Sequence, residues 1–164
     1  METVFVVSVR APEGMRRYVT VLPPETVRER GLPAEAIVGV LTRPEGEDGG
    51  GPADVFTPNP AFVRFLHTVL ARHAPEQPGL RDEAARIGDG FVYLYDARTP
   101  APATGAAPRE DVIGAVKVAA GVPVPDSYRA NPGHHLLTAR GFFQLGEELH
   151  ACLMAELDAL RSAG

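Results

Sequence analysis

Several residue types are scarce in this chain, and each scarcity argues against a class of protein. Cys152 is the only cysteine among the 164 residues, so no intramolecular disulfide can form. Lys117 is the only lysine and follows no glycine-rich loop, which argues against both a Schiff base and a Walker-type phosphate site. Ser8, Ser127 and Ser162 are the only serines, and none lies in a Gly-x-Ser-x-Gly hydrolase motif.

Long apolar runs and basic clusters are also missing. The sequence nowhere holds the roughly 18 uninterrupted apolar residues of a membrane-spanning helix, so we expect no membrane partner. The net charge is −5, with the acidity concentrated in residues 44–58 and 142–164. Because no stretch offers phosphate a basic surface, we expect no nucleic-acid partner. The N-terminus has no leader-like pattern, which with the unpaired cysteine predicts a cytoplasmic protein.

The rest of the composition predicts one globular domain over residues 1–164. Hydrophobic residues make up 45% of the chain and charged residues 23%, which is ordinary for a folded protein with a single core. Two segments rich in glycine or proline, near residues 44–58 and 99–109, have little to bury. We expect them to be mobile loops.

Short β-branched and aromatic runs predict about five or six strands. The run at residues 4–9 is apolar on both faces, which is typical of a central strand. The other expected strands lie at residues 18–22, 36–41, 91–95, 112–118 and 122–124. The strands at residues 4–9 and 18–22 should form one hairpin, and those at residues 112–118 and 122–124 should form another. Pro123 confines the last of these strands to a sheet edge.

Three or four helices are predicted, a short first one from its proline start and the stop at Gly31, and the others from apolar residues at helical spacing, with Asn59-Pro60 beginning the second. They fall at residues 24–30, 60–73, 80–87 and 142–160. The order of elements lacks regular alternation of strands and helices. We therefore expect an α+β fold in two layers, with a mostly antiparallel sheet and the helices packed on it.

The irregular segment 125–141 holds the main catalytic candidates, His134 and His135. Imidazoles in a loop can transfer protons near neutral pH, and Asp96, just after a strand, is a possible carboxylate partner. Adjacent side chains in an extended stretch point to opposite sides, and no histidine pair has zinc-type spacing. We therefore expect no metal and no cofactor. A surface pair would tolerate replacement by alanine with a stability change of about 0.5 kcal/mol or less.

Four further residues are candidates for binding a ligand or partner: Arg98, Tyr128, Arg129 and Asn131. Arg98 has a structural alternative, because Asp96 and Arg98 could pair with each other or cap a turn.

The remaining candidates for chemistry have structural explanations. Cys152 belongs to the C-terminal apolar stripe, which predicts a buried, inert thiol. His73 lies on the stripe of its helix and should be packed or end that helix. His67 and His150 lie off the stripes and should be solvated or interfacial.

Two hypotheses for function follow. The first is a non-catalytic binding or interaction module, such as an accessory subunit or adaptor, with a protein or small ligand as partner and a homo-oligomer as an option. The alternative is a small enzyme that combines His134 or His135 with Asp96, Arg98 or Arg129 in a loop-lined cleft. Convergence of these side chains around a pocket would favour the enzyme, and their dispersal would favour the module.

Overall fold

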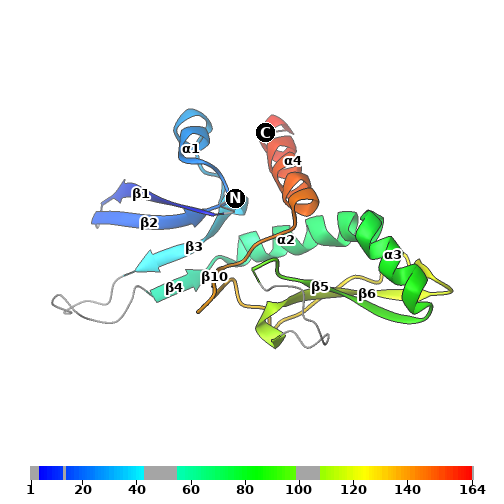
Figure 1. Cartoon of the computed structure of the whole chain (residues 1–164). Helices are drawn as coiled ribbons and strands as arrows, with labels where there is room; N and C mark the ends of the chain where they lie inside the picture. Colours follow the sequence, from blue (N-terminus) through cyan, green and yellow to red (C-terminus); the bar gives the residue numbers. More distant parts are fainter. Residues whose placement is uncertain (1–3, 13, 43–54, 99–107, 164) are drawn as a thin grey trace. The chain divides into compact units, whose positions relative to one another are not determined.

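A computed structural model describes residues 4–12, 14–42, 55–98 and 108–163 (Figure 1). The chain divides into two compact units, Met1–Phe65 and Leu66–Gly164. The boundary falls inside helix α2 (Pro60–His73). One domain over the whole chain stays a prediction, and residues 44–54 and 99–107 of the predicted loops lie outside the described residues.

The α+β class is confirmed. The described residues form four α-helices and ten strands, and the strands pair antiparallel. They make two four-stranded sheets and one two-stranded sheet instead of a single sheet of five or six strands. Two helices separate the strands of the first sheet from those of the second along the chain, and four of the later strands are only two residues long.

The first unit contains a sheet in which neighbouring strands follow one another in the chain (Figure 1). Its strands are β1 (Phe5–Ala11), β2 (Gly14–Thr20), β3 (Ile37–Thr42) and β4 (Val55–Pro58). The predicted hairpin of β1 and β2 is confirmed by their antiparallel register. Helix α1 (Pro24–Arg30) and the 3-10 helix η1 (Ala34–Ala36) connect β2 to β3, and α1 has the predicted bounds.

The first strand does not lie where its sequence predicts. β1 is at the edge of the sheet, with β2 as its one neighbour among the described strands, so the expectation of a central strand is wrong. Val6 and Val9 are 48% and 39% exposed. An apolar run on both faces is typical of covered strands, but it measures composition and not the presence of a covering layer. The loop expected up to residue 58 also ends earlier, because β4 pairs with β3.

In the second unit, helix α3 (Pro78–Ile87) contacts the strands of the second sheet (Figure 1). That sheet contains β5 (Gly90–Tyr95), β6 (Val112–Ala119), β7 (Val122–Pro123) and β8 (Arg129–Ala130). β5 and β7 flank β6, and β8 also pairs with β6. Alternate residues of β5 are buried, which places the others on the opposite face.

The hairpin of β6 and β7 is confirmed. Ala120 and Gly121 at its turn have φ angles of 52° and 78°, the left-handed pair that a tight hairpin turn requires. Pro123 pairs with Val118 on the outer strand, where its missing N–H leaves no gap in a central ladder.

The remaining elements of the second unit are short, apart from the C-terminal helix. They are the 3-10 helices η2 (Ala74–Glu76) and η3 (Arg109–Asp111), the strands β9 (Leu137–Thr138) and β10 (Gly141–Phe142), and helix α4 (Glu147–Ala163). None of the helices in the described part of the chain has the length and apolar character needed to cross a bilayer.

Helix α4 begins five residues later than the sequence predicts. Phe143 and Leu145 are buried while Gln144 between them is exposed, so this stretch is extended and its apolar residues follow a period of two. Within the helix, Leu153 and Leu157 are buried as expected. Cys152 is only half-buried, so the prediction of a buried thiol is too strong.

Candidate functional site

A buried group of charged side chains follows β5, and we call it the Arg98 cluster. It contains Asp96, Arg98, Asp111 and His134, whose side chains are 0%, 1%, 0% and 4% exposed. Three of these four are residues that the sequence analysis singled out. The cluster brings together the end of β5, helix η3 and the irregular segment before β9.

The guanidinium of Arg98 uses all of its nitrogens inside the protein. Nε donates to Oδ1 of Asp111 at 2.9 Å, and both terminal nitrogens donate to backbone carbonyls. The carbonyl acceptors are those of Leu136 at 3.3 Å, Gly141 at 3.0 Å, Glu110 at 3.2 Å and His135 at 2.5 Å. Buried charges are stable only when they are paired and hydrogen-bonded. Arg98 therefore holds the irregular segment onto the end of the sheet.

Asp96 is also fully engaged. Its Oδ1 accepts the backbone N–H groups of Arg98 at 3.1 Å and Gln144 at 2.8 Å. Its Oδ2 lies 2.9 Å from Nε2 of His134 and 3.6 Å from Nε of Arg98. The predicted pairing of Asp96 with Arg98 is present, although it is buried and not on the surface.

The two adjacent histidines have different environments. His134 is directed at Asp96, whereas the side chain of His135 is exposed and hydrogen-bonds to no described residue. His135 takes part only through its backbone, which donates to Glu110 and accepts from Arg98. The expectation that both belong to a loop surface is therefore wrong for His134.

Replacement of the two histidines should separate their roles. We expect His134→Ala to lower the free energy of unfolding by about 1–3 kcal/mol, because it leaves the buried carboxylate of Asp96 short of a donor. His135→Ala should change it by about 0.5 kcal/mol or less. Urea denaturation of each single variant is the measurement, and equal effects would contradict this assignment.

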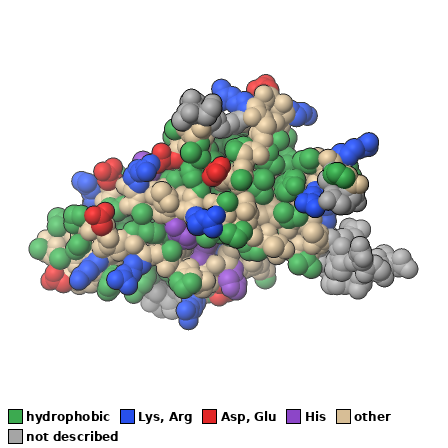
Figure 2. All heavy atoms as spheres, turned by 180° about the vertical axis from the view of Figure 1, so that it is seen from behind, with side chains coloured by type: hydrophobic (Ala, Val, Ile, Leu, Met, Phe, Trp, Pro, Cys, Tyr) green, Lys and Arg blue, Asp and Glu red, His purple; other side chains and the backbone are tan. Residues whose placement is uncertain are grey.

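A second polar pair lies nearby in the same unit. Nδ1 of His67 is 2.7 Å from the hydroxyl of Tyr128, so His67 is not simply solvated. Burial raises the pKa of Tyr128 and lowers the pKa of His67, and repulsion from His134 lowers the pKa of His67 further. A neutral phenol therefore faces a ring that favours its neutral form. All five histidines belong to the second unit, and Figure 2 shows histidine side chains (purple) on this face of the molecule.

The lowered histidine pKa values make stability depend on pH. Burial lowers the pKa of both His67 and His150 below 6.5 in the folded protein, and Nδ1 of His150 is buried with no hydrogen-bond partner among the described residues. As the pH falls through about 6.5, the unfolded chain takes up these protons first, so stability is present above that pH and is lost below it.

Urea titrations between about pH 7.5 and 5.5 measure this loss. We expect His67→Asn, which keeps an acceptor near the position of Nδ1, to reduce the fall in stability across this range. An unchanged fall would contradict a neutral, buried His67.

The side chains of the other predicted binding residues differ in whether they are already hydrogen-bonded within the protein. The side-chain amide of Asn131 donates to the carbonyls of Arg109 at 3.0 Å and Val112 at 2.8 Å, and its Oδ1 accepts from Gly133, so its role is structural. Arg129 is exposed and has no partner among the described residues. No group of three or more His, Cys, Asp or Glu side chains in the described ranges is placed to hold a metal.

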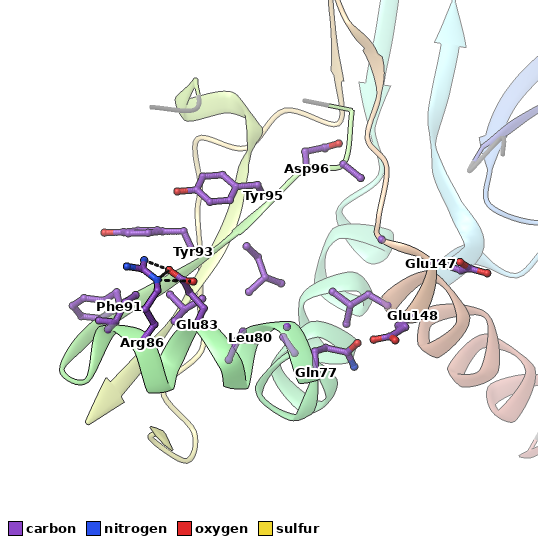
Figure 3. Close-up of a pocket in the computed structure, with 18 residues that line it drawn as sticks. Gln77, Leu80, Glu83, Arg86, Phe91, Tyr93, Tyr95, Asp96, Glu147 and Glu148 are labelled. Atoms are coloured by element: carbon purple, nitrogen blue, oxygen red, sulfur yellow. Dashed lines mark hydrogen bonds and ion pairs between the residues drawn. The ribbon is translucent and has the colours of Figure 1, made fainter. Parts of the chain in front are cut away.

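A groove that the sequence did not indicate runs along β5, and we call it the β5 groove. It has a volume of about 1140 Å³ and is lined by α3, residues 91–97 and the start of α4 (Figure 3). Phe91, Tyr93 and Tyr95 are 47%, 51% and 40% exposed and project from the same face of the strand. Their spacing at every second residue was the signal for this aromatic face.

Comparison with known proteins finds no relative of this chain. No protein family, no curated protein and no solved structure matches it.

Proposed function

We propose that the protein is a non-catalytic interaction module that binds an extended segment of a partner protein in the β5 groove. The observation that carries this proposal is that the groove follows an open, uncharged sheet edge. Every residue from Phe91 to Ala97 lines it, which is possible only if the groove runs along the edge of the strand. Addition of a peptide strand to such an edge is a recurring mode of recognition.

The backbone of β5 is the first source of affinity. β6 is its only neighbour among the described strands, so one edge of Gly90–Tyr95 has N–H and C=O groups free for a new strand. The N–H of Ala97 is already bonded to the carbonyl of Gln144 at 2.8 Å, which marks the end of the open stretch. Proteins commonly protect an exposed edge with charged residues or proline, and β5 has neither.

The side chains around the edge predict the chemistry of the partner. On the face toward α3 the groove presents Leu80, Val92 and Leu94, and on the other face it presents the three aromatic rings. Alternate side chains of an added strand would lie on these two faces, and both are apolar. We therefore infer a segment of about five or six residues that is apolar at successive positions, to match the length of β5.

The charges at the rim favour a basic residue at one end of that segment. Glu147 and Glu148 are exposed at the start of α4, line the groove, and have no side-chain partner among the described residues. Glu83 also lines the groove, but it is paired with Arg86 on α3. Rim charges of this kind select partners and speed association more than they add affinity.

The 2.9 Å contact between His134 and Asp96 is the observation in favour of the alternative, a small enzyme. A general base has to reach a proton on its substrate. The ring of His134 is 4% exposed, and Asp96 accepts the N–H groups of Arg98 and Gln144 at Oδ1 and is paired with His134 at Oδ2. His135 and Arg129 do not join this pair. These contacts support a structural role, and the interaction module remains the better-supported function.

Binding of synthetic peptides to the whole protein tests the proposal. From an array of random peptides of about ten residues, we expect selection of short uncharged runs rich in β-branched and aromatic residues, with Lys or Arg at one end. In calorimetry with a selected peptide, N-methylation of its alternate amides should weaken binding about tenfold or more by removing hydrogen bonds to β5. Selection of helical or acidic peptides would contradict the proposal.

Two matched variants locate the binding. Tyr93→Glu places a charge on the aromatic face and should weaken binding about tenfold or more by analogy with loss of an aromatic anchor. Val122→Glu makes the same kind of change at 59% exposure on β7, at the opposite edge of the sheet, and should have no effect. If instead the protein alone forms a dimer that Tyr93→Glu dissociates, the occupant is a second copy and the partner segment is excluded.

A further inference from the structure

A second concave site lies beside β6, and we call it the Arg129 pocket. Its volume is about 410 Å³, and its lining includes Tyr93, Arg109, Ala115, Arg129 and Pro132. Tyr93 pairs with Ala115, and Ala115 pairs with Arg129, so these three side chains form one row on the same face of three adjacent strands. It is the face of Tyr93 and not that of buried Val92 and Leu94.

The row leaves a slot of defined width. Adjacent strands are about 4.8 Å apart, which puts the backbones of Tyr93 and Arg129 roughly 10 Å from each other. Ala115 between them has only a methyl group, and its neighbours Gly114 and Ala130 are also small. A planar ring can lie in this slot with one face against the phenol ring and the other against the guanidinium, because aromatic and guanidinium planes both stack on aromatic rings. The ring of Tyr95 is 6.5 Å from that of Tyr93 and extends the aromatic wall.

The pocket has positive charge that no described lining residue neutralises. Arg109 and Arg129 are exposed, and neither side chain has a hydrogen bond or ion pair with a described residue. None of the lining residues is acidic. Arg109 lies across Gly133, where a β-carbon would come within 2.8 Å of its Nε, so the glycine makes room for the guanidinium beside the pocket. Two unpaired guanidinium groups favour an anion that accepts paired hydrogen bonds, such as a phosphate.

We propose that the Arg129 pocket binds a mononucleotide, with its base in the slot between Tyr93 and Arg129 and its phosphate at Arg109. The volume is in the usual range for a small-molecule site. The same chemistry occurs at the end of a single-stranded nucleic acid. We assign the free nucleotide, because the chain has a net charge of −5 and only two of the residues that line the pocket are arginines. Tyr93 lines both this pocket and the β5 groove, but neither arginine lines the groove, so the arginine substitutions test the pocket separately.

Calorimetric titration of the whole protein with the four ribonucleoside monophosphates tests the inference. We expect at least one to bind with a Kd below about 1 mM, and to bind about tenfold more weakly to Arg109→Ala and to Arg129→Ala. The matching nucleoside and inorganic phosphate should each bind at least about tenfold more weakly than the monophosphate, because each lacks one half of the recognition. Arg86→Ala, an arginine on α3 outside the pocket, is the control and should bind normally.

Three results would overturn the inference. The first is the absence of saturable binding by all four monophosphates up to about 10 mM, well beyond the weakest affinity expected. The second is binding that survives both arginine substitutions in variants whose thermal unfolding matches that of the parent protein. The third is a 5′-phosphorylated eight-nucleotide single strand that binds about a hundredfold more tightly than any mononucleotide, which would make nucleic acid the ligand.

Discussion

Arg98→Ala is expected to lower the free energy of unfolding by about 3–5 kcal/mol, the usual cost of removing one partner from a buried ion pair. The side chain is 1% exposed, and its removal leaves Asp111 and Asp96, both fully buried, without the guanidinium. It also removes a donor from four backbone carbonyls, of which those of Glu110 and Leu136 keep the N–H groups of His135 and Phe143. Urea denaturation followed by circular dichroism measures the change.

Two further substitutions show whether geometry or charge is responsible. Arg98→Lys keeps the charge but cannot reach both carboxylate and carbonyl acceptors, so most of the loss should remain. Arg86→Ala removes an exposed arginine that is paired with Glu83 and should leave the unfolding midpoint unchanged. An Arg98→Ala variant as stable as the parent would mean that the cluster does not hold the irregular segment in place.

Phe143→Ala is the second substitution with a large expected effect, a loss of about 3–5 kcal/mol. Phe143 is 0% exposed, and its backbone N–H donates to the carbonyl of Leu136 at 2.7 Å. Truncation of the ring would open a cavity in a segment with little regular structure to close it. The free energy of unfolding in urea is again the measurement.

Phe91→Ala is the matched control, because it makes the same chemical change at 47% exposure on β5. It should lower stability by about 1 kcal/mol or less, as surface positions do. It should nevertheless weaken peptide binding in the β5 groove. If both phenylalanines cost the same stability, the aromatic face of β5 is not free in the folded protein.

The local elements of the fold could be read from the sequence, because their signals are local. Proline at the first helical position and glycine just after the last gave α1 its bounds, and Asn59 before Pro60 gave the start of α2. The Oδ1 atom of Asn59 accepts the N–H of Ala61 at 3.3 Å, as a helix cap should. The turn at Ala120 and Gly121 was likewise marked by its own residues.

The position of a strand within its sheet, at an edge or in the centre, could not be predicted from local residues. It depends on which other strands and layers lie beside that strand. The sequence of β1 resembles that of a covered strand, yet β1 is an edge. The aromatic and β-branched residues of β5 predict a strand, but nothing in its composition shows that one of its edges is open. For the same reason the β5 groove was missed, since its walls come from residues 74–97 and 146–149.

The candidate residues of the site were found more easily than their roles. Asp96, Arg98 and His134 stood out because charged and imidazole groups in a turn-rich segment suggest chemistry. In the folded unit they are neighbours, separated by as many as 38 residues in the chain, and they are buried. Because these groups are buried and paired with one another, their role is structural and not catalytic. Burial within an irregular segment cannot be predicted from a single sequence.

The register between β5 and β6 has a practical consequence for following the protein in solution. Lys117 lies directly opposite Phe91 and is exposed, and it is the only lysine in the chain. An amine-reactive fluorophore would therefore attach to one side chain, apart from the terminal amine, and would lie beside the aromatic rings. Its emission would change whenever a molecule bound next to Phe91. One labelled sample could therefore serve as a sensor in screens for natural binding partners.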